Sequence, residues 1–332
     1  MKKCFLFITA LVLALSLVGC EAFYYGTVVD GIIPKDGITI VTTNFFLYDT
    51  ARTIARDRDN VIMLISPGAE SHDFELTLAD MAAIETCDLF AYVGGEGEGW
   101  VYDALDTFGE NGIEVPTFCA MEAVEEAGML VHSAGEHDHD HDSHEHSHWE
   151  GIDDHVWLSI PNALVIYEAM LDTLQGYYED WWDPAADEAE QDSADNWKYR
   201  LTMLDEKFRT LTESVENPSI LVADRFPFAY LTETYGIAYA AAFEGCTSDT
   251  EPSLDTVNRL ISLTETLSPR TILVTELSDR QTASSIAAQV NGVTIAELHS
   301  CHNVTKEDFE SGVTYFDLME RNYTVLENLW NK

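Results

Sequence analysis

The chain has 332 residues, of which 59 are Asp or Glu and 17 are Lys or Arg, so its formal net charge is −42 at pH 7. Hydrophobic residues make up 46% of the sequence, which excludes a disordered acidic tail and leaves room for about two domains with cores of their own. The acidic surface excludes nucleic acid and makes anionic membranes unsuitable partners, because phosphate groups would be repelled, and it favours cations as ligands.

The N-terminal residues resemble a bacterial export signal. Met1–Lys3 is basic, and the uncharged apolar run Phe5–Val18 is too short for a comfortable transmembrane helix. The sequence Leu-Val-Gly-Cys that ends at Cys20 resembles a lipobox, in which cleavage leaves the cysteine as a lipid-modified first residue. We therefore expect a signal peptide over residues 1–19 and a lipid-anchored tether over residues 20–37, on the extracellular side of the membrane. The alternative is an ordinary signal peptide with an incidental cysteine.

Strands and helices are predicted to alternate through the first part of the mature chain. The expected elements are strand 38–43, helix 46–56, strand 61–65, helix 76–84, strand 88–93, helix 100–108 and strand 114–119. This order predicts a parallel sheet with helices on both faces. The glycine-rich segment 94–99 carries two carboxylates and no Lys, so we do not expect it to bind phosphate.

The middle of the chain is predicted to be helical. One helix is expected over 163–178, and a break at Asp183–Pro184 precedes an amphipathic helix of about 30 residues over 185–215. Its apolar positions recur every three or four residues, at Trp197, Leu201, Leu204, Phe208 and Leu211. Such a helix can join two lobes as a stiff connector, although a hairpin packed on one lobe is the alternative.

The last part repeats the first pattern. The expected elements are strand 219–223, helix 228–235, strand 237–243, helix 253–267, strand 271–275, helix 278–290, strand 293–297 and helix 306–330. Ser278–Gln281 resembles a capping box at the start of its helix. We therefore predict an α/β protein of two similar doubly wound lobes, over residues 38–183 and 217–332, joined by a helix over 184–216.

The cysteines leave a choice between disulfides and free thiols. Cys87, Cys119, Cys246 and Cys301 remain in the mature chain beyond Cys20, and an oxidising location permits disulfides. The preferred single bridge is Cys246–Cys301, since both are expected in loops of the second lobe. Four buried free thiols are the alternative.

Histidines give the clearest sign of chemistry. Seven of the eleven lie within residues 132–148, alternating with carboxylates, and such a loop offers several weak sites for a borderline divalent ion such as zinc. The other four are expected in loops at or beside the ends of strands, where ligand groups of doubly wound sheets gather. They are His72, His155, His299 and His302.

Two of these histidines lie in segments that resemble a known family. Residues 66–75, Ser-Pro-Gly-Ala-Glu-Ser-His-Asp-Phe-Glu, are similar to the first ligand motif of the zinc and manganese solute-binding lipoproteins of ABC importers. Residues 153–159, Asp-Asp-His-Val-Trp-Leu-Ser, are similar to their second motif, and the His-rich loop precedes it as in the zinc members. Segments 228–236 and 251–253 resemble the third-motif region. The resemblance implies two α/β lobes, a rigid backbone helix and one metal ion in the cleft.

The third motif departs from the family. Its usual histidine position holds Arg225, which stays protonated and cannot bind a cation. Asp224 could bind in its place or could pair with Arg225. The family's last ligand is a carboxylate in the loop before the terminal helix, and here His302 is the favoured substitute, with His299 as an alternative. Glu276 is a further candidate, either as a ligand or as a carboxylate that orients a histidine.

The predicted metal site therefore consists of His72, His155, His302 and Asp224. Three imidazoles and one carboxylate suit Zn²⁺ better than Mn²⁺. We expect no enzyme but a monomeric binding protein that captures extracellular zinc and delivers it to an ABC permease. The alternatives are an extracellular zinc hydrolase, a manganese carrier and a surface zinc buffer. The sequence contains no H-E-x-x-H and no G-x-S-x-G motif, which argues against a hydrolase.

Overall fold

The structure is a computed structural model that describes residues 37–55, 60–70, 74–131, 149, 151–177, 188–243, 245, 252–268 and 270–331. The predicted signal peptide with Cys20, the His-rich loop 132–148, His72 and Cys246 lie outside these residues. Within the described part of the chain, no helix combines the length and the apolar character needed to cross a membrane.

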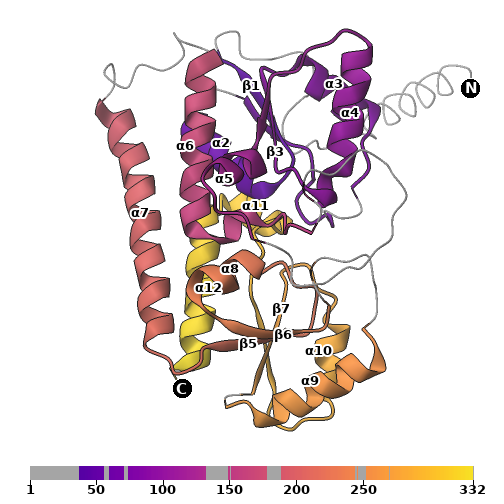
Figure 1. Cartoon of the computed structure of the whole chain (residues 1–332), viewed down its shortest axis with the longest axis vertical. Helices are drawn as coiled ribbons and strands as arrows, with labels where there is room; N and C mark the ends of the chain where they lie inside the picture. Colours follow the sequence, from indigo (N-terminus) through magenta and orange to yellow (C-terminus); the bar gives the residue numbers. More distant parts are fainter. Residues whose placement is uncertain are drawn as a thin grey trace, which may run out of the picture.

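Two four-stranded parallel sheets form the centres of two lobes (Figure 1). The first sheet has the order β2-β1-β3-β4, and its strands are Thr39–Thr42 (β1), Asn60–Met63 (β2), Leu89–Tyr92 (β3) and Thr117–Cys119 (β4). The second has the order β6-β5-β7-β8, with strands Ser219–Val222 (β5), Ala238–Ala241 (β6), Thr271–Val274 (β7) and Thr294–Glu297 (β8). The two lobes repeat one topology, which confirms the predicted fold class.

Helices cover these sheets because the central strands are buried on both faces, as in parallel sheets generally. All four residues of β1 and of β3 are buried. The helices of the first lobe are α2 (Phe45–Ala55), α3 (Leu78–Thr86), α4 (Gly99–Glu110) and α5 (Ala120–Glu126), with the short 3₁₀ turns η2 (Glu96–Glu98) and η3 (Val156–Leu158). Those of the second lobe are α8 (Ala229–Tyr235), α9 (Leu254–Thr266) and α10 (Gln281–Ala287).

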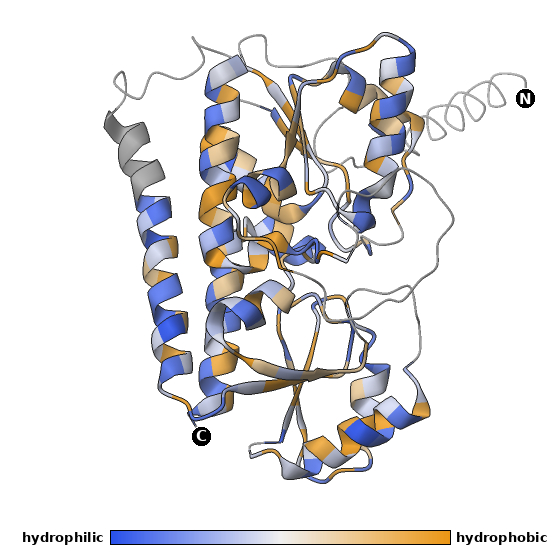
Figure 2. Ribbon diagram, viewed as in Figure 1, coloured by the Kyte–Doolittle hydropathy of each residue, from blue (hydrophilic) through white to orange (hydrophobic). Residues whose placement is uncertain are grey.

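A long helix joins the lobes along one side of the molecule. This helix, α7 (Glu188–Glu213), packs against α6 (Ile160–Tyr177) and α12 (Tyr315–Trp330). Trp197 of α7 stacks on Tyr167 of α6 with ring centroids 4.4 Å apart, and Phe208 stacks on Tyr235 of α8 at 4.9 Å. Figure 2 shows that the coloured part of α7 is largely hydrophilic outside these contacts. One apolar stripe thus contacts both lobes, as the spacing of its apolar residues predicts.

The C-terminal segment returns to the first lobe. The amide of Phe45 donates to the carbonyl of His302 at 2.9 Å, and the amide of Gly68 donates to the carbonyl of Val304 at 2.7 Å. The amide of Tyr315 donates to Oδ2 of the buried Asp49 at 2.8 Å. Residues after β8 therefore contribute contacts to the first lobe. The limits 38–183 and 217–332 given above for the two lobes stay a prediction.

The structure corrects three expectations about helices. Helix α5 was not predicted. The single terminal helix is two, α11 (Lys306–Ser311) and α12, because Gly312 adopts φ +75° and ends the first. The capping box at Ser278–Gln281 is wrong: the residue before α10 is Arg280, which has a left-handed backbone and makes no capping hydrogen bond through its side chain.

The preferred Cys246–Cys301 disulfide is wrong as well. Cys301 lies in the loop between β8 and α11, but it is a free thiol with no exposed surface and belongs to the larger hydrophobic core. Cys87 and Cys119 are also free and buried.

Candidate metal centre

A small pocket lies where loops from the carboxyl ends of strands meet the C-terminal segment. Ile65 and Val93 follow β2 and β3, and His302 lies in the loop after β8. The other residues of its lining are Gly97, Glu98, Trp100, Asp154 and Trp157. Ligand sites of doubly wound sheets form at this edge.

His155 adjoins the pocket residue Asp154 in the sequence, and two neighbouring carboxylates hold its ring. Its side chain is buried, and Oδ1 of Asp153 accepts the backbone N–H of His155 at 2.9 Å and lies 3.1 Å from its Nδ1. Oδ1 of Asp154 lies 2.9 Å from the same Nδ1. Among the described residues, these three form the group of His, Cys, Asp or Glu side chains whose ligand atoms all lie within 4.8 Å of one another. A carboxylate on one ring nitrogen commonly orients a histidine whose other nitrogen binds metal.

The structure brings His302 beside His155. Their ring centroids are 5.5 Å apart, and each ring lies 5.3 Å from the ring of the buried Trp157. Nε1 of Trp157 donates to the carbonyl of Ser300 at 2.8 Å, which fixes the loop that carries His302. Two predicted ligands from segments nearly 150 residues apart thus lie together.

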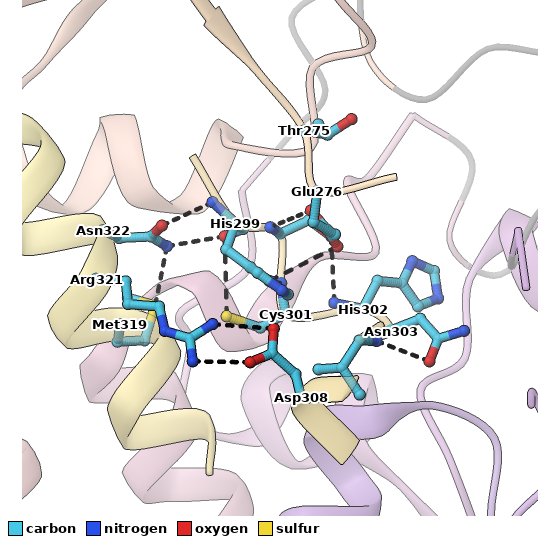
Figure 3. A network of polar contacts seen from close by, with 12 residues as sticks. Thr275, Glu276, His299, Cys301, His302, Asn303, Asp308, Met319, Arg321 and Asn322 are labelled. Carbon is cyan, nitrogen blue, oxygen red and sulfur yellow. Dashed lines mark hydrogen bonds and ion pairs between the residues drawn. The ribbon is translucent and has the colours of Figure 1, made fainter. Parts of the chain in front are cut away.

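The other imidazole of this loop, His299, is engaged through one of its two ring nitrogens. His299 is buried; its Nδ1 accepts the backbone N–H of Cys301 at 2.9 Å, and its own amide and carbonyl bind the side-chain amide of Asn322. Figure 3 shows the ring of His302 pointing away from this network. Nδ1 of His299 is thus engaged within the loop, whereas its Nε2 is buried and makes no hydrogen bond to a described residue, so His299 stays an alternative ligand.

Glu276 supports the same loop. Its carboxylate accepts the amide of Ser300 at 2.8 Å and the hydroxyl of Ser300 at 2.5 Å. The hydroxyl of Ser300 in turn accepts the backbone N–H of His302 at 3.2 Å. This geometry fits the alternative in which Glu276 supports a histidine instead of binding the ion.

Both oxygens of Asp224 are engaged within the second lobe. Oδ2 accepts the amide and the hydroxyl of Thr275 at 3.2 and 3.0 Å, and Oδ1 accepts the backbone N–H of Arg225 at 2.9 Å. The guanidinium of Arg225 reaches Glu70 of the first lobe instead, with Nη1 3.4 Å from Oε1. Binding of metal by Asp224 would have to replace these hydrogen bonds.

Sequence reasoning missed Glu98 and Asp154. Glu98 is 6% exposed, and its Oε2 accepts the amides of Val93 and Gly94 at 2.7 and 3.0 Å. Burial raises the pKa of Glu98 to about 7. The sequence does show the carboxylates of the glycine-rich segment and Asp154 directly before His155. Their positions beside the pocket depend on the fold, so the sequence alone does not reveal them.

Known proteins share this architecture. A family model described as "Zinc-uptake complex component A periplasmic" matches residues 40–329. The high-affinity zinc uptake system protein ZnuA of Bacillus subtilis is 29% identical over 293 residues, covering 88% of both chains. The zinc-binding lipoprotein AdcA of Streptococcus pneumoniae is 30% identical, and the match covers 87% of this chain and 55% of that protein. The crystal structure of the Zn(II)-bound ZnuA-like domain of AdcA superposes with a TM-score of 0.68 at 26% identity, covering 89% of this chain and all of that one.

Two parallel α/β lobes with imidazoles gathered at their strand ends define the class of two-lobed binding proteins for metal ions. Within that class, this chain belongs to the zinc-uptake component A family of periplasmic binding proteins. The family is one of metal-binding transport proteins and not of enzymes.

Proposed function

We propose that this protein captures zinc outside the cytoplasm and delivers it to an ABC permease, tethered to the membrane through a lipid on Cys20. The observation that carries the proposal is the pair of imidazoles, His155 and His302, 5.5 Å apart between ring centroids. Zinc prefers nitrogen ligands and a coordination number of four, whereas manganese prefers oxygen.

His72 is proposed as the third imidazole. The described residues on both sides of it support this assignment. The carbonyl of Ala69 accepts from Nδ2 of Asn303, the residue after His302, at 2.8 Å. The ring of Phe74 lies 5.1 Å from that of Trp100, which lines the pocket.

The His-rich loop is proposed to gather zinc through weak sites. The described residues that flank it lie close to the site, because the amide of Asp153 donates to the carbonyl of Val131 at 3.2 Å. The hydroxyl of Tyr230 in the second lobe accepts the amide of Val131 at 3.1 Å. Zinc released by the loop would therefore have a short path to His155.

The test is zinc titration in competition with a chelator strong enough to hide weak sites. His155→Ala and His302→Ala should each weaken the tight site by more than about 100-fold, because each removes a ligand outright. The control is His141→Ala, which removes one imidazole of the loop and should leave the tight site unchanged.

A variant without residues 132–148 separates a carrier from a buffer. Residues 149–152 remain between the paired Val131 and Asp153 and can close the gap, so the variant should keep one tight site per chain. Loss of tight binding in that variant, or its persistence in both His155→Ala and His302→Ala, would show that the proposed site is wrong. Turnover of an ester, peptide or phosphate substrate would favour the hydrolase instead.

A further inference from the structure

The hydroxyl of Tyr230 joins the second lobe to the segments around His155. Tyr230 lies on α8 and is 1% exposed, and its hydroxyl oxygen accepts the backbone N–H of Val131 at 3.1 Å. Helix α8 also packs against η3, the turn that begins directly after His155. A side chain of the second lobe thus reaches the first lobe next to the proposed zinc site.

A series of hydrogen bonds continues from Val131 to the imidazole. The carbonyl of Val131 accepts the amide of Asp153 at 3.2 Å. Oδ1 of Asp153 in turn accepts the backbone N–H of His155 at 2.9 Å and lies 3.1 Å from its Nδ1. Asp153 and His155 are both buried. A shift of Val131 would therefore move the carboxylate that orients the ring of His155.

The surroundings of Tyr230 keep its hydroxyl neutral. Burial raises the pKa of Tyr230, the hydrogen bond from Val131 lowers it, and the negative charges of Asp153 and Asp154 raise it further. These charges act on the phenol because it lies near the carboxylates that hold His155. Replacement of Tyr230 by Phe therefore removes one hydrogen-bonding group and no charge.

Another contact between the lobes is weaker. Nη1 of Arg225 lies 3.4 Å from Oε1 of Glu70, but the two side chains are 25% and 42% exposed. Solvent screens an ion pair of this kind, so it contributes little. Loss of the Tyr230 hydroxyl would instead leave the amide of Val131 facing a buried ring that offers no acceptor, which is costly.

We propose that Tyr230 is a positioning residue for zinc binding. Its hydroxyl holds Val131 and thereby fixes Asp153, which orients the imidazole of His155. The placement of the second lobe thus affects how firmly the first lobe holds the ion. Tyr230 acts through other residues, so it controls the rate of zinc release and not the identity of the ligands. This inference rests on the proposed zinc-binding function.

The experiment compares Tyr230→Phe with Tyr235→Phe in the full-length chain. Tyr235 is the matched control, because it is buried on the same helix and its hydroxyl donates to Oδ1 of Asp205 at 2.9 Å. Zinc release is followed by stopped-flow mixing of the loaded protein with excess chelator. Tyr230→Phe should raise the dissociation rate about tenfold, the lower end for residues that orient metal ligands, and Tyr235→Phe should not change it. Circular dichroism verifies that both variants are folded.

A double-variant cycle with Asp153→Asn tests the route of this effect. Asn keeps the size of the side chain and one oxygen acceptor, but it orients the imidazole less firmly because it carries no charge. If Tyr230 acts through Asp153, the double variant should release zinc more slowly than the product of the two separate increases predicts. An increase equal to that product would overturn the inference, since it would show that the two residues act independently.

The outcomes separate this inference from the proposed function. If His155→Ala and His302→Ala abolish tight binding but Tyr230→Phe leaves the dissociation rate unchanged, the function stands and the inference fails. Equal increases in Tyr230→Phe and Tyr235→Phe would also overturn it, because they would reflect a general loosening of α8. A changed absorption spectrum of bound Co²⁺ in Tyr230→Phe would do the same, since it would report an altered ligand set. If neither histidine substitution weakens zinc binding, the proposed function itself fails.

Discussion

Asp308 and Arg321 form a two-armed ion pair that ties α11 to α12. Nη1 and Nη2 of Arg321 lie 3.0 and 2.8 Å from Oδ2 and Oδ1 of Asp308. The hydrogen bonds from Arg321 lower the pKa of Asp308 below its ordinary value of 3.8. This pair is partly exposed, so its contribution to stability is limited by solvent.

We predict that Asp308→Asn lowers the free energy of unfolding at pH 7 by about 1 kcal/mol or less. The folded-state pKa is the lower one, so the ion pair stabilises the protein above the unfolded-state value and is lost as the pH falls through the folded-state value. Urea unfolding between pH 7 and pH 3 should therefore show the deficit shrinking in acid. Arg321→Met should behave in the same way, and a deficit that is constant with pH would contradict the explanation.

The backbone conformation of Cys301 sets the direction of the loop that carries His299 and His302. Its φ of +58° is unusual for a residue other than glycine, and it turns the chain between His299 and His302. The sequence placed both histidines near the site and favoured His302, whose ring lies beside that of His155. It left His299 as an alternative, and the left-handed backbone of Cys301 between the two histidines leaves no signal in residue spacing. Asp154 was missed for a related reason, since only the folded glycine loop brings a pocket around it.

At the scale of elements, two glycines show how backbone conformation alone affects stability, because a side chain at either position would make no new contact. Gly312 has φ +75° where α11 ends, and Gly109 lies within α4 without a positive φ. A Cβ at either position meets nothing within 4 Å. Any effect of alanine at these positions therefore arises from the backbone.

Gly312→Ala should destabilise the protein by about 1 kcal/mol, because a left-handed backbone disfavours a side chain. Gly109→Ala should instead stabilise it by about 0.5 to 1 kcal/mol, because alanine loses less conformational freedom in a helix. Chemical denaturation of both variants measures the two differences. Effects of the same sign would show that these positions are not governed by backbone conformation.

Most strands and helices were predictable because their apolar spacing is regular and glycine or proline separates many of them. Helix α5 was missed since it begins at Ala120, directly after β4 ends at Cys119, with no residue typical of a break. The end of α11 was missed because the apolar spacing continues through Gly312 into α12. Arg280 adopts a left-handed backbone before α10, so the side-chain pattern that suggested a capping box does not produce one.

The net charge of −42 acts on the molecule as a whole. Repulsion among carboxylates opposes the compact state, and salt screens it over a distance of about 10 Å at 0.1 M. We predict that the melting temperature rises as NaCl is increased from about 10 to about 300 mM, where the screening length falls below that value. The measurement should include EDTA, so that traces of divalent ions cannot produce the same effect. A melting temperature that stays constant or falls would show that the charges are spaced too widely to matter.

The return of the C-terminal segment to the first lobe has a consequence for biosynthesis. Val313 accepts a hydrogen bond from Arg52, and the amide of Tyr315 binds Asp49, 266 residues earlier in the chain. During translation the first lobe emerges from the ribosome long before these partners exist. Until nearly the whole polypeptide has been made, Asp49 of α2 has Arg52 of its own helix as a partner but lacks the amide of Tyr315. The contacts of the first lobe are therefore completed only after synthesis has passed the second lobe.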